Sequence, residues 1–344
     1  MKRTLVLVAG LVFLFMAIAP GAMAAKINLR YADHNPESGQ AAQRATLPFL
    51  KKIEDATNGD VAIETFFGET IFKTRDTWDG LKNGIADMGW MVLSYWPGKV
   101  PLTDAFGMPG IAYTTPGDIG AALWRAYEKY PEMQSEYVKG GLRPIIFFSS
   151  EPYWVATIKK PVANVADIKG LKMRSLGGVA TTQMKALGAV PMSIPMPDNY
   201  ISLQKGVVDG LGICAEAVSI WRFYEVLKYY NDAPLPASYF TIPISERMWK
   251  KIPKETQDQI MSVCGEEGSR WYAENYFGYF VSEMPKIAEE NGHPQTFNAL
   301  TPEARDEWIK ASEPCFDEYY SYADKKNVGP QARQLVKELM DGTL

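Results

Sequence analysis

The first two thirds of the chain alternate short segments that have the period of a β-strand with segments that have the period of a helix. Residues 27–33, INLRYAD, carry apolar side chains at every second position, which predicts a half-buried strand. Residues 40–59 carry apolar side chains near helical spacing and end at Asn58-Gly59, a common helix terminator. The same rhythm recurs to about residue 206. It predicts parallel or mixed sheets flanked by helices, twice over, and therefore an α/β fold.

The last third has a pattern typical of long amphipathic helices. From residue 245 onward apolar positions follow helical spacing, and one further strand is predicted at residues 295–300, QTFNAL. The 344 residues are 47% hydrophobic and 22% charged, an ordinary globular composition with enough length for two folded lobes.

The N-terminus has the pattern of a secretory signal peptide. Lys2 and Arg3 precede an apolar run that extends from residue 5 to 19, and Ala22-Met23-Ala24 is a small-x-small cleavage site. The alternative is an uncleaved anchor, but the run is shorter than the ~20 residues that span a bilayer. We therefore expect residues 1–24 to be removed and the mature protein to lie in the periplasm. Removal takes the net charge from −4 to −6, which is unfavourable for nucleic-acid binding.

Cysteines and histidines give no support for a metal or a cofactor. Cys214, Cys264 and Cys315 are far apart and odd in number, so buried apolar roles are expected for them. The two histidines, His34 and His293, have no Cys or His neighbour at metal-ligand spacing. We predict no metal site, no cofactor and no Ser-His or Cys-His catalytic triad.

The sequence disfavours two kinds of enzyme. Residues 210–215, GLGICA, match the dinucleotide fingerprint G-x-G-x-x-A, but they follow a helix-like segment late in the chain and no second nucleotide half is visible. A secreted hydrolase or carbohydrate enzyme would need a nucleophile with a base or a pair of carboxylates, and no G-x-S-x-G is present. The sequence therefore indicates a protein that is not an enzyme.

Arg174 is the most informative single residue. It lies at the end of the short apolar stretch GLKMRSLGG, residues 170–178, where two glycines allow a ligand or backbone to approach closely. Crevices at the carboxyl ends of strands in α/β sheets are the usual ligand sites. A guanidinium matches a carboxylate through two parallel hydrogen bonds. Spacing alone leaves two partners open, an internal Asp or Glu and the carboxylate of a ligand.

A long ordered block around Arg174 resembles one family, the DctP-like solute-binding subunits of tripartite ATP-independent periplasmic (TRAP) transporters. The resemblance is carried by ADIKGLKMRSLGG, MKALGAVPMSIPMPDNYISLQKGVVDG and FYEVLKYY, and by DATNGDVAIETFFGETIF, DGLKNGIADMGW and ISERMWKKIPKETQDQI. It implies that Arg174 binds the ligand carboxylate. It also implies membrane subunits of the transporter as partners, and we expect a monomer that binds no nucleic acid.

The resemblance implies a clamshell of two α/β domains with mixed sheets, joined by crossing strands and a long hinge helix. On this pattern we expect domain I at residues 25–150 and about 239–280. Domain II is expected at residues 151–238 and about 281–344. A sensor-associated binding protein of the same fold stays open as an alternative.

Two positions depart from the family pattern. Many members of the family carry a second arginine at the position where this chain has Trp154. Many also carry an asparagine that touches the ligand at the position where this chain has Ile213, which Cys214 follows. A dicarboxylate or a many-hydroxyl sugar acid would find fewer polar partners there. We therefore expect a monocarboxylate with an apolar or aromatic body.

Weaker candidates for ligand contact lie in loops and at strand ends. Asn199 is near the cleft by the motif's layout, whereas its neighbour Asp198 is expected to cap a helix. Tyr153 is expected to point away from the face that carries Trp154. Glu216 is considered as a partner of Arg174 or of another cation. The remaining candidates for ligand contact are Glu69, His34 and Trp96. Trp90 and Tyr95 are close to Trp96 in the sequence and are candidates for the pocket wall with it.

Overall fold

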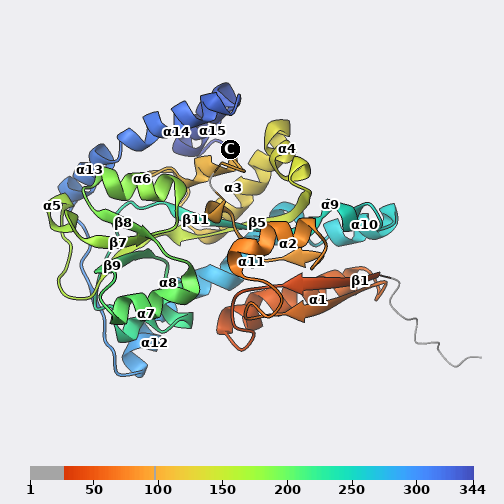
Figure 1. The fold of residues 1–344 in the computed structure, drawn as a ribbon, viewed down its shortest axis with the longest axis horizontal. Helices are drawn as coiled ribbons and strands as arrows, with labels where there is room; N and C mark the ends of the chain where they lie inside the picture. Colours follow the sequence, from red (N-terminus) through yellow and green to blue (C-terminus); the bar gives the residue numbers. More distant parts are fainter. Residues whose placement is uncertain (1–26, 97) are drawn as a thin grey trace, which may run out of the picture.

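In the computed structural model, which describes residues 27–96 and 98–344, the strands form two mixed β-sheets (Figure 1). The predicted signal peptide, residues 1–24, lies outside the described residues. The first sheet has the order β2 (Val61–Phe66), β1 (Ile27–Ala32), β3 (Met88–Gly89), β11 (Ala237–Ser245), β4 (Met91–Val92), and β5 (Leu142–Pro152) also pairs with β11. The second has the order β12 (Thr296–Phe297), β10 (Tyr229–Asn231), β6 (Trp154–Thr157), β9 (Gly210–Ile213), β7 (Lys172–Ser175), β8 (Val190–Ser193).

The strands form where the alternating pattern predicts them. In β1 the side chains of Leu29 and Tyr31 are buried while Asn28 is exposed, as expected for a strand with one face on the core. Strand β1 pairs in parallel with β2 and β3, and β11 pairs antiparallel with its neighbours. In the second sheet β7 pairs in parallel with β8 and β9, while β6 is antiparallel to β9 and β10. Both sheets are therefore mixed, and the predicted α/β class is confirmed.

Helices cover both sheets. Beside the first sheet lie α1 (Leu47–Ala56), α2 (Thr77–Lys82), α3 (Pro116–Lys129), α4 (Pro131–Lys139), α9 (Glu246–Trp249) and α10 (Lys254–Met261), with short turns at Ala42–Thr46, Thr74–Asp76, Leu93–Tyr95 and Thr103–Gly107. Beside the second sheet lie α5 (Val165–Ile168), α6 (Gly178–Ala186), α7 (Asn199–Gln204) and α8 (Ala215–Ile220), with short turns at Met196–Asp198 and Phe223–Glu225. None of the described helices is both long and apolar enough to cross a membrane.

The chain passes between the sheets in three places. Strand β5 of the first sheet runs almost directly into β6 of the second, and residues 232–236 connect β10 back to β11. The third passage is a helix that continues through α11 (Gly265–Ala273), a π-helical turn at Glu274–Gly278 and α12 (Tyr279–Glu290). Its first part packs on α3 and β5, and its last part packs on α8. These passages provide the crossing strands and the hinge helix of the predicted clamshell.

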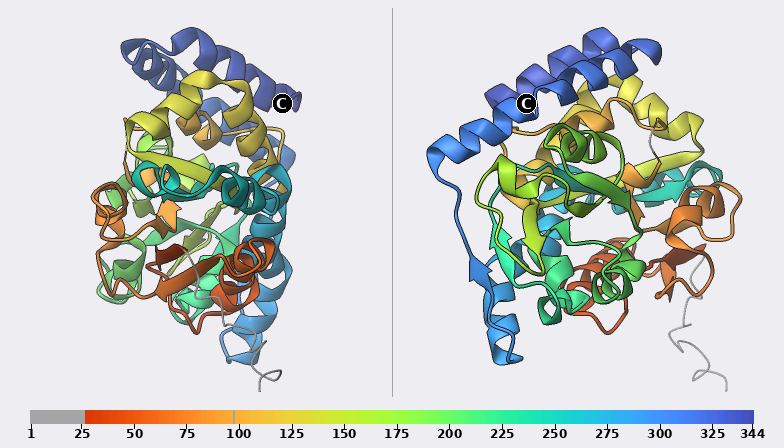
Figure 2. Two further views of the ribbon diagram at one scale, coloured as in Figure 1. Left: turned by 90° about the vertical axis from the view of Figure 1, so that its right-hand side faces the viewer. Right: turned by 60° about the vertical axis from the view of Figure 1, so that its left-hand side comes forward.

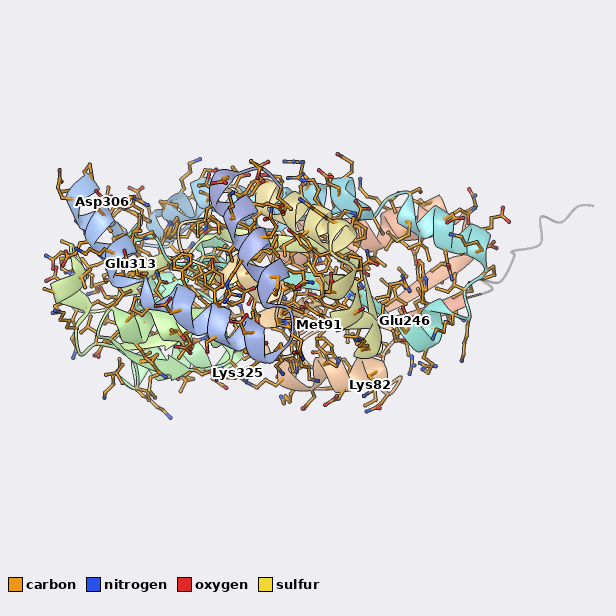
Figure 3. All side chains as sticks on the ribbon, turned by 90° about the horizontal axis from the view of Figure 1, so that it is seen from above. Lys82, Met91, Glu246, Asp306, Glu313 and Lys325 are labelled. Carbon is orange, nitrogen blue, oxygen red and sulfur yellow. The ribbon has the colours of Figure 1, made fainter. Side chains whose placement is uncertain are left out.

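The C-terminal helices lie across the outside of both halves (Figure 2). They are α13 (Pro302–Ala311), α14 (Pro314–Lys325) and α15 (Gly329–Asp341). Helix α13 packs against α5 and α14 against α6, next to the second sheet. Seen from above, Asp306, Glu313 and Lys325 follow the path of α13 and α14 over the molecule (Figure 3).

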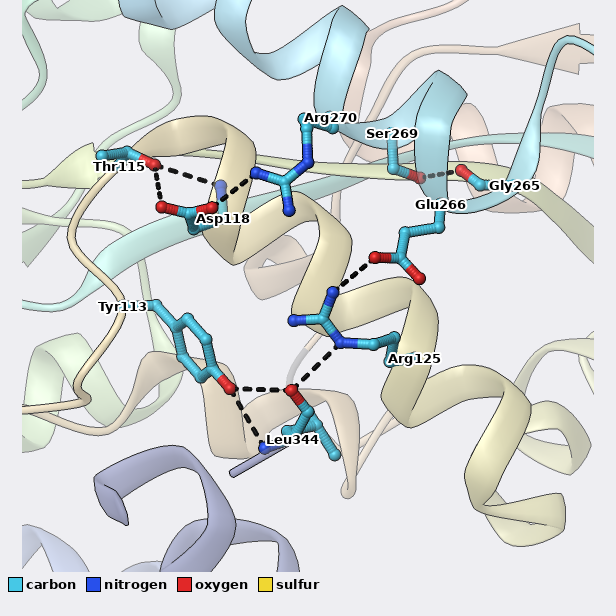
Figure 4. A network of polar contacts seen from close by, with 9 residues as sticks. All are labelled: Tyr113, Thr115, Asp118, Arg125, Gly265, Glu266, Ser269, Arg270 and Leu344. Atoms are coloured by element: carbon cyan, nitrogen blue, oxygen red, sulfur yellow. Dashed lines mark hydrogen bonds and ion pairs between the residues drawn. The ribbon is translucent and has the colours of Figure 1, made fainter. Parts of the chain in front are cut away.

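Helix α15 returns to the first sheet's side of the molecule. Glu338 accepts hydrogen bonds from Lys129 at 2.7 Å and from the hydroxyl of Tyr130 at 2.9 Å, both beside α3. At the chain end, Arg125 of α3 donates to the backbone oxygen of Leu344 at 3.0 Å (Figure 4). The C-terminal segment thus contacts both halves of the molecule.

Polar contacts also fix the hinge helix to α3. Arg270 pairs with Asp118 and Arg125 with Glu266, each at 2.5 Å (Figure 4). Helix α3 itself begins where Thr115 accepts a hydrogen bond from the backbone of Asp118. The first part of the hinge helix is therefore held to the first sheet's helices, while its last part follows the second sheet.

Candidate functional site

A small cavity lies where the two halves meet. It is lined by residues that follow strands of both sheets and by one residue of the π-helical turn in the hinge helix. They are His34, Asn35, Trp90, Val92, Tyr95 and Phe240 from the first sheet's side, Tyr153, Leu176, Met196, Cys214, Glu216 and Trp221 from the second, and Phe277. The loops after β1, β7 and β9 leave the carboxyl ends of their strands at this place, as is usual for ligand sites in α/β folds. The lining is mainly aromatic and apolar.

Arg174, on β7, has none of its surface exposed and is not itself among the lining residues, but it lies directly behind two of them, Tyr95 and Leu176. Its Nε donates to the backbone oxygen of Ile194 at 3.1 Å, and its Nη2 lies 3.5 Å from the hydroxyl of Tyr95. Its Nη1 has no hydrogen-bond partner. Among the described residues no carboxylate pairs with it, Glu216 included. A buried guanidinium without a counter-ion is costly, so the site is suited to an anion.

Tyr95 connects Arg174 to the cavity. It lies in the Leu93–Tyr95 turn after β4, on the first sheet's side, and its ring lines the cavity. Its hydroxyl oxygen accepts the backbone N–H of Met196 at 3.2 Å and faces Nη2 of Arg174. Because two donors already point at this oxygen, its own hydrogen is free to donate elsewhere. Arg174 and Tyr95 together can therefore offer several donors to one carboxylate.

The sheet register places Trp154 and Ile213 outside the cavity. The two residues are partners across β6 and β9, so their side chains lie on the same face. On that face Trp154 packs edge-on against Tyr230 and Phe297, with ring centroids 6.1 and 5.3 Å away. Neither Trp154 nor Ile213 is among the cavity-lining residues.

Their neighbours Tyr153 and Cys214 lie on the opposite face and line the cavity. Cys214 was among the expected ligand contacts, whereas Tyr153 was expected to point away. The sequence predicts that neighbouring residues face opposite ways. The face that meets the cavity carries Tyr153 and Cys214, not Trp154 and Ile213. Burial is the largest cause that raises the pKa of both groups, Tyr153 and Cys214, well above their ordinary values.

Asn199 is buried just behind the cavity wall. Its amide nitrogen donates to the backbone oxygens of Pro195 at 3.1 Å and Met196 at 3.2 Å, while its Oδ1 has no partner. These bonds hold the turn that places Met196 in the wall and Ile194 against Arg174. Asp198 stands at the N-cap of α7, but its side chain makes no capping hydrogen bond.

Glu69 and Trp96 also lie away from the cavity. Glu69 has a positive φ of 60°, and its carboxylate pairs with Lys73 and accepts the backbone N–H of Thr74 at 2.8 Å. Trp96 donates its indole N–H to the backbone oxygen of Arg75 at 3.2 Å. Both side chains thus have structural partners, Glu69 in its own loop and Trp96 in the Thr74–Asp76 turn.

His34 lines the cavity beside Trp90, with ring centroids 4.9 Å apart. It is 7% exposed, its Nδ1 has no hydrogen-bond partner, and burial lowers its pKa to about 4. The ring is therefore neutral at physiological pH and has one nitrogen that accepts. No group of described His, Cys, Asp and Glu residues is arranged to hold a metal ion.

Comparisons with known proteins agree with this architecture. The family model of bacterial extracellular solute-binding proteins, family 7 (DctP), matches residues 32–322. A C4-dicarboxylate-binding periplasmic protein DctP of Vibrio cholerae is 23% identical over 78% of this chain and 79% of its own length. A solute-binding protein of Albidiferax ferrireducens is 25% identical over 71% of this chain and 72% of its own length.

Solved structures show the same fold. A TRAP solute-binding protein from Rhodoferax ferrireducens, in complex with copurified benzoate, has a TM-score of 0.84 and 19% identity over 92% of this chain and 98% of its own. A TRAP periplasmic solute-binding protein from Bordetella bronchiseptica, with bound mandelate, has a TM-score of 0.81 and 22% identity over 92% and 99%. Another from Roseobacter denitrificans, with bound glucuronate, has a TM-score of 0.77 and 18% identity over 91% and 99%.

Proposed function

The chain belongs to bacterial extracellular solute-binding protein family 7, the solute-binding subunits of TRAP transporters, and on that premise we propose that it captures a monocarboxylate with an apolar or aromatic body. The observation that carries this proposal is the buried Arg174 with an unpartnered Nη1 beside an aromatic cavity. The ligand carboxylate would supply the missing partner of the guanidinium.

The cavity favours an acid with one carboxylate over a dicarboxylate or a sugar acid. Within the described part of the chain no lysine or arginine is among the residues that line it, and Arg174, which contacts the lining residue Tyr95, is the cation that we assign to the first carboxylate. A second carboxylate would lose its hydration without gaining a cation, and a sugar's hydroxyls would find few partners. Similar solved structures hold benzoate, mandelate or 3-hydroxybenzoate in some cases and uronates in others, so they do not decide between these ligand classes. The proposal for this chain therefore rests on the residues that line its own cavity.

The aromatic groups that suit such a body include Trp90 and Tyr95, which the sequence offered as candidates, but not Trp154. Trp154 lies outside the cavity, and its place is taken by rings from several elements. These rings belong to Trp90, Tyr95, Tyr153, Trp221, Phe240 and Phe277.

Capture would involve closure of the two lobes. Residues from both halves line the cavity, and three passages of the chain connect the sheets. A ligand that contacts both halves only when they are together shifts the population toward the closed form. The closed complex would then deliver the acid to the membrane subunits of the transporter, with no chemical change to the ligand. We propose that the protein acts as a monomer, exported by its signal peptide.

A thermal-shift screen tests this function. The purified mature protein is melted with benzoate, phenylacetate, mandelate, succinate and glucuronate at equal concentration. A ligand that binds the folded state raises the melting temperature by mass action. We expect the aromatic monocarboxylates to raise it most. A larger shift with succinate or glucuronate would contradict the proposed ligand class.

A further inference from the structure

Glu216, in the cavity wall, is a second buried ionisable side chain, after Arg174, that lacks a full set of hydrogen-bond partners. It lies in the first turn of α8, is 4% exposed and lines the cavity. Its Oε1 makes no hydrogen bond of normal geometry, its Oε2 faces the thiol of Cys214 at 4.0 Å, and the hydroxyl of Tyr276 is the one nearby donor that lowers its pKa. An unsatisfied buried carboxyl costs free energy, so such a group requires an explanation.

Glu216 and Arg174 belong to different elements and form no ion pair with each other. In the parallel pair β7 and β9, Arg174 is level with Leu211, and Glu216 follows five residues later. The three strand steps from Leu211 to Cys214 alone cover about 10 Å. Tyr153 and Cys214 line the wall between the two charged groups. A ligand anchored at Arg174 therefore presents its far end to Glu216.

The surroundings of Glu216 are rich in acceptors and contain no cation among its described partners. Burial, and after it the charges of Glu151 and Asp33, raises the pKa of Glu216 to about 8. The unpartnered Nδ1 of the neutral His34 lines the same cavity. The carboxyl of Glu216 and one imidazole nitrogen of His34 can therefore accept hydrogen bonds from a ligand, and the indole N–H of Trp90, which also has no partner, lines the same cavity.

A comparison with Asp33 shows how the protein satisfies a buried carboxylate that has a structural role. Asp33 accepts hydrogen bonds from the hydroxyl of Tyr31 at 2.9 Å and from two nitrogens of Asn35 at 2.9 and 2.8 Å. It does not line the ligand cavity. Glu216 receives no such set of donors, although it is equally buried and does line the cavity.

We propose that Glu216 is a specificity-determining residue that accepts a hydrogen bond from a hydroxyl or amino group on the ligand, at the end remote from its carboxylate. The inference rests on the proposed function, because it needs a ligand anchored at Arg174. It narrows the substrate class to aromatic or apolar monocarboxylates that carry a remote hydrogen-bond donor.

Matched ligands test the inference by calorimetry. The probes are the 3- and 4-isomers of ethylbenzoate, hydroxymethylbenzoate and (aminomethyl)benzoate, which have nearly the same shape and differ in the remote group. We expect at least one hydroxymethyl or aminomethyl acid to bind about tenfold or more tightly than its ethyl counterpart. Preference for the hydroxymethyl acid indicates a protonated Glu216, and preference for the aminomethyl acid an ionised one.

Two variants connect the preference to Glu216. In Glu216→Leu the advantage of the donor-bearing acids should fall below about twofold. Glu216→Gln keeps the shape and one acceptor, so it should retain the hydroxymethyl advantage and lose the aminomethyl one. Glu136→Gln is the control, since Glu136 bonds to the backbone of Leu102 and Thr103, away from the cavity.

The outcomes separate this inference from the function on which it rests. If an ethylbenzoate binds as tightly as its donor-bearing counterparts, or if the advantage persists in Glu216→Leu, the role of Glu216 is refuted while the aromatic-acid function stands. If none of the six acids binds the wild-type protein, both are refuted.

Discussion

Arg174 and Tyr95 come from opposite halves of the molecule and meet at the cavity, with Nη2 of the arginine 3.5 Å from the tyrosine hydroxyl. The arginine belongs to β7 of the second sheet, and the tyrosine follows β4 of the first. A carboxylate bound beside both groups would have donors from both lobes. The contact between Arg174 and Tyr95 would therefore couple ligand binding to closure of the two lobes.

Replacing Arg174 with alanine should weaken binding of an aromatic monocarboxylate by about 100-fold or more, because a buried carboxylate loses its charged partner. Arg174→Lys keeps the charge but not the planar fork, so it should recover only part of the loss. Calorimetry with the best acid from the thermal-shift screen gives both values. Arg305→Ala is the control, since Arg305 pairs with Asp232 at the surface. Wild-type affinity in a folded Arg174→Ala variant would refute the assignment.

Tyr95→Phe should reduce affinity by about 1 kcal/mol or more, because the ring remains in the wall and only the hydroxyl is lost. The same change removes the acceptor of the Met196 backbone N–H. Titration calorimetry of the variant measures the loss. Tyr113→Phe, which removes a hydroxyl that contacts Leu344 instead, should leave the affinity unchanged. Equal effects of the two substitutions would argue against a ligand contact of Tyr95.

Trp154 and Tyr153 should respond differently to substitution. Trp154→Ala removes ring contacts with Tyr230 and Phe297, so it should lower the free energy of unfolding by about 2 kcal/mol and leave ligand affinity nearly unchanged. Tyr153→Ala removes part of the cavity wall and should weaken binding about tenfold. Chemical denaturation and calorimetry on both variants test this. A larger loss of affinity in Trp154→Ala would show that the sequence-based expectation was right.

The protein should be more stable to unfolding at pH 5 than at pH 8. Burial is the main cause that raises the pKa of several carboxyl groups, to about 7 in Asp33, Asp104 and Glu151 and to about 8 in Glu136 and Glu216. Their pKa values in the unfolded chain are near 4, so the folded state binds more protons between about pH 4 and 8. Stability from these groups is therefore present at low pH and lost as the pH rises through their folded values.

One group opposes this trend. Burial lowers the pKa of His34 to about 4, so the unfolded state binds the extra proton below about pH 6.5 and stability from this group falls as the pH falls. Five carboxyl groups outweigh one histidine. Thermal melts without ligand from pH 5 to 8 measure the balance, and a melting temperature that rises with pH would contradict it. The double variant Asp104→Asn, Glu136→Gln should flatten the curve.

The sequence by itself predicted local elements and singled out Arg174 as the candidate anchor. Alternating positions such as Leu29 and Tyr31 predict β1, and the position of Arg174 at a strand end before two glycines predicts an anion site. These features depend on near neighbours in the chain, whose side-chain period follows from backbone geometry alone. The two-domain fold followed from a resemblance that covers most of the mature chain, and the structure agrees with it.

Only the tertiary structure decided which residues form the cavity. The period of β6 shows that Tyr153 and Trp154 face opposite ways, but which face meets the cavity depends on pairing with β9 and on what packs beyond it. In the same way, Phe240 and Phe277 reach the cavity from segments far along the chain. The missing partner of Glu216 is also a tertiary fact, because a side chain's donors come from residues that are distant in sequence and adjacent only after folding.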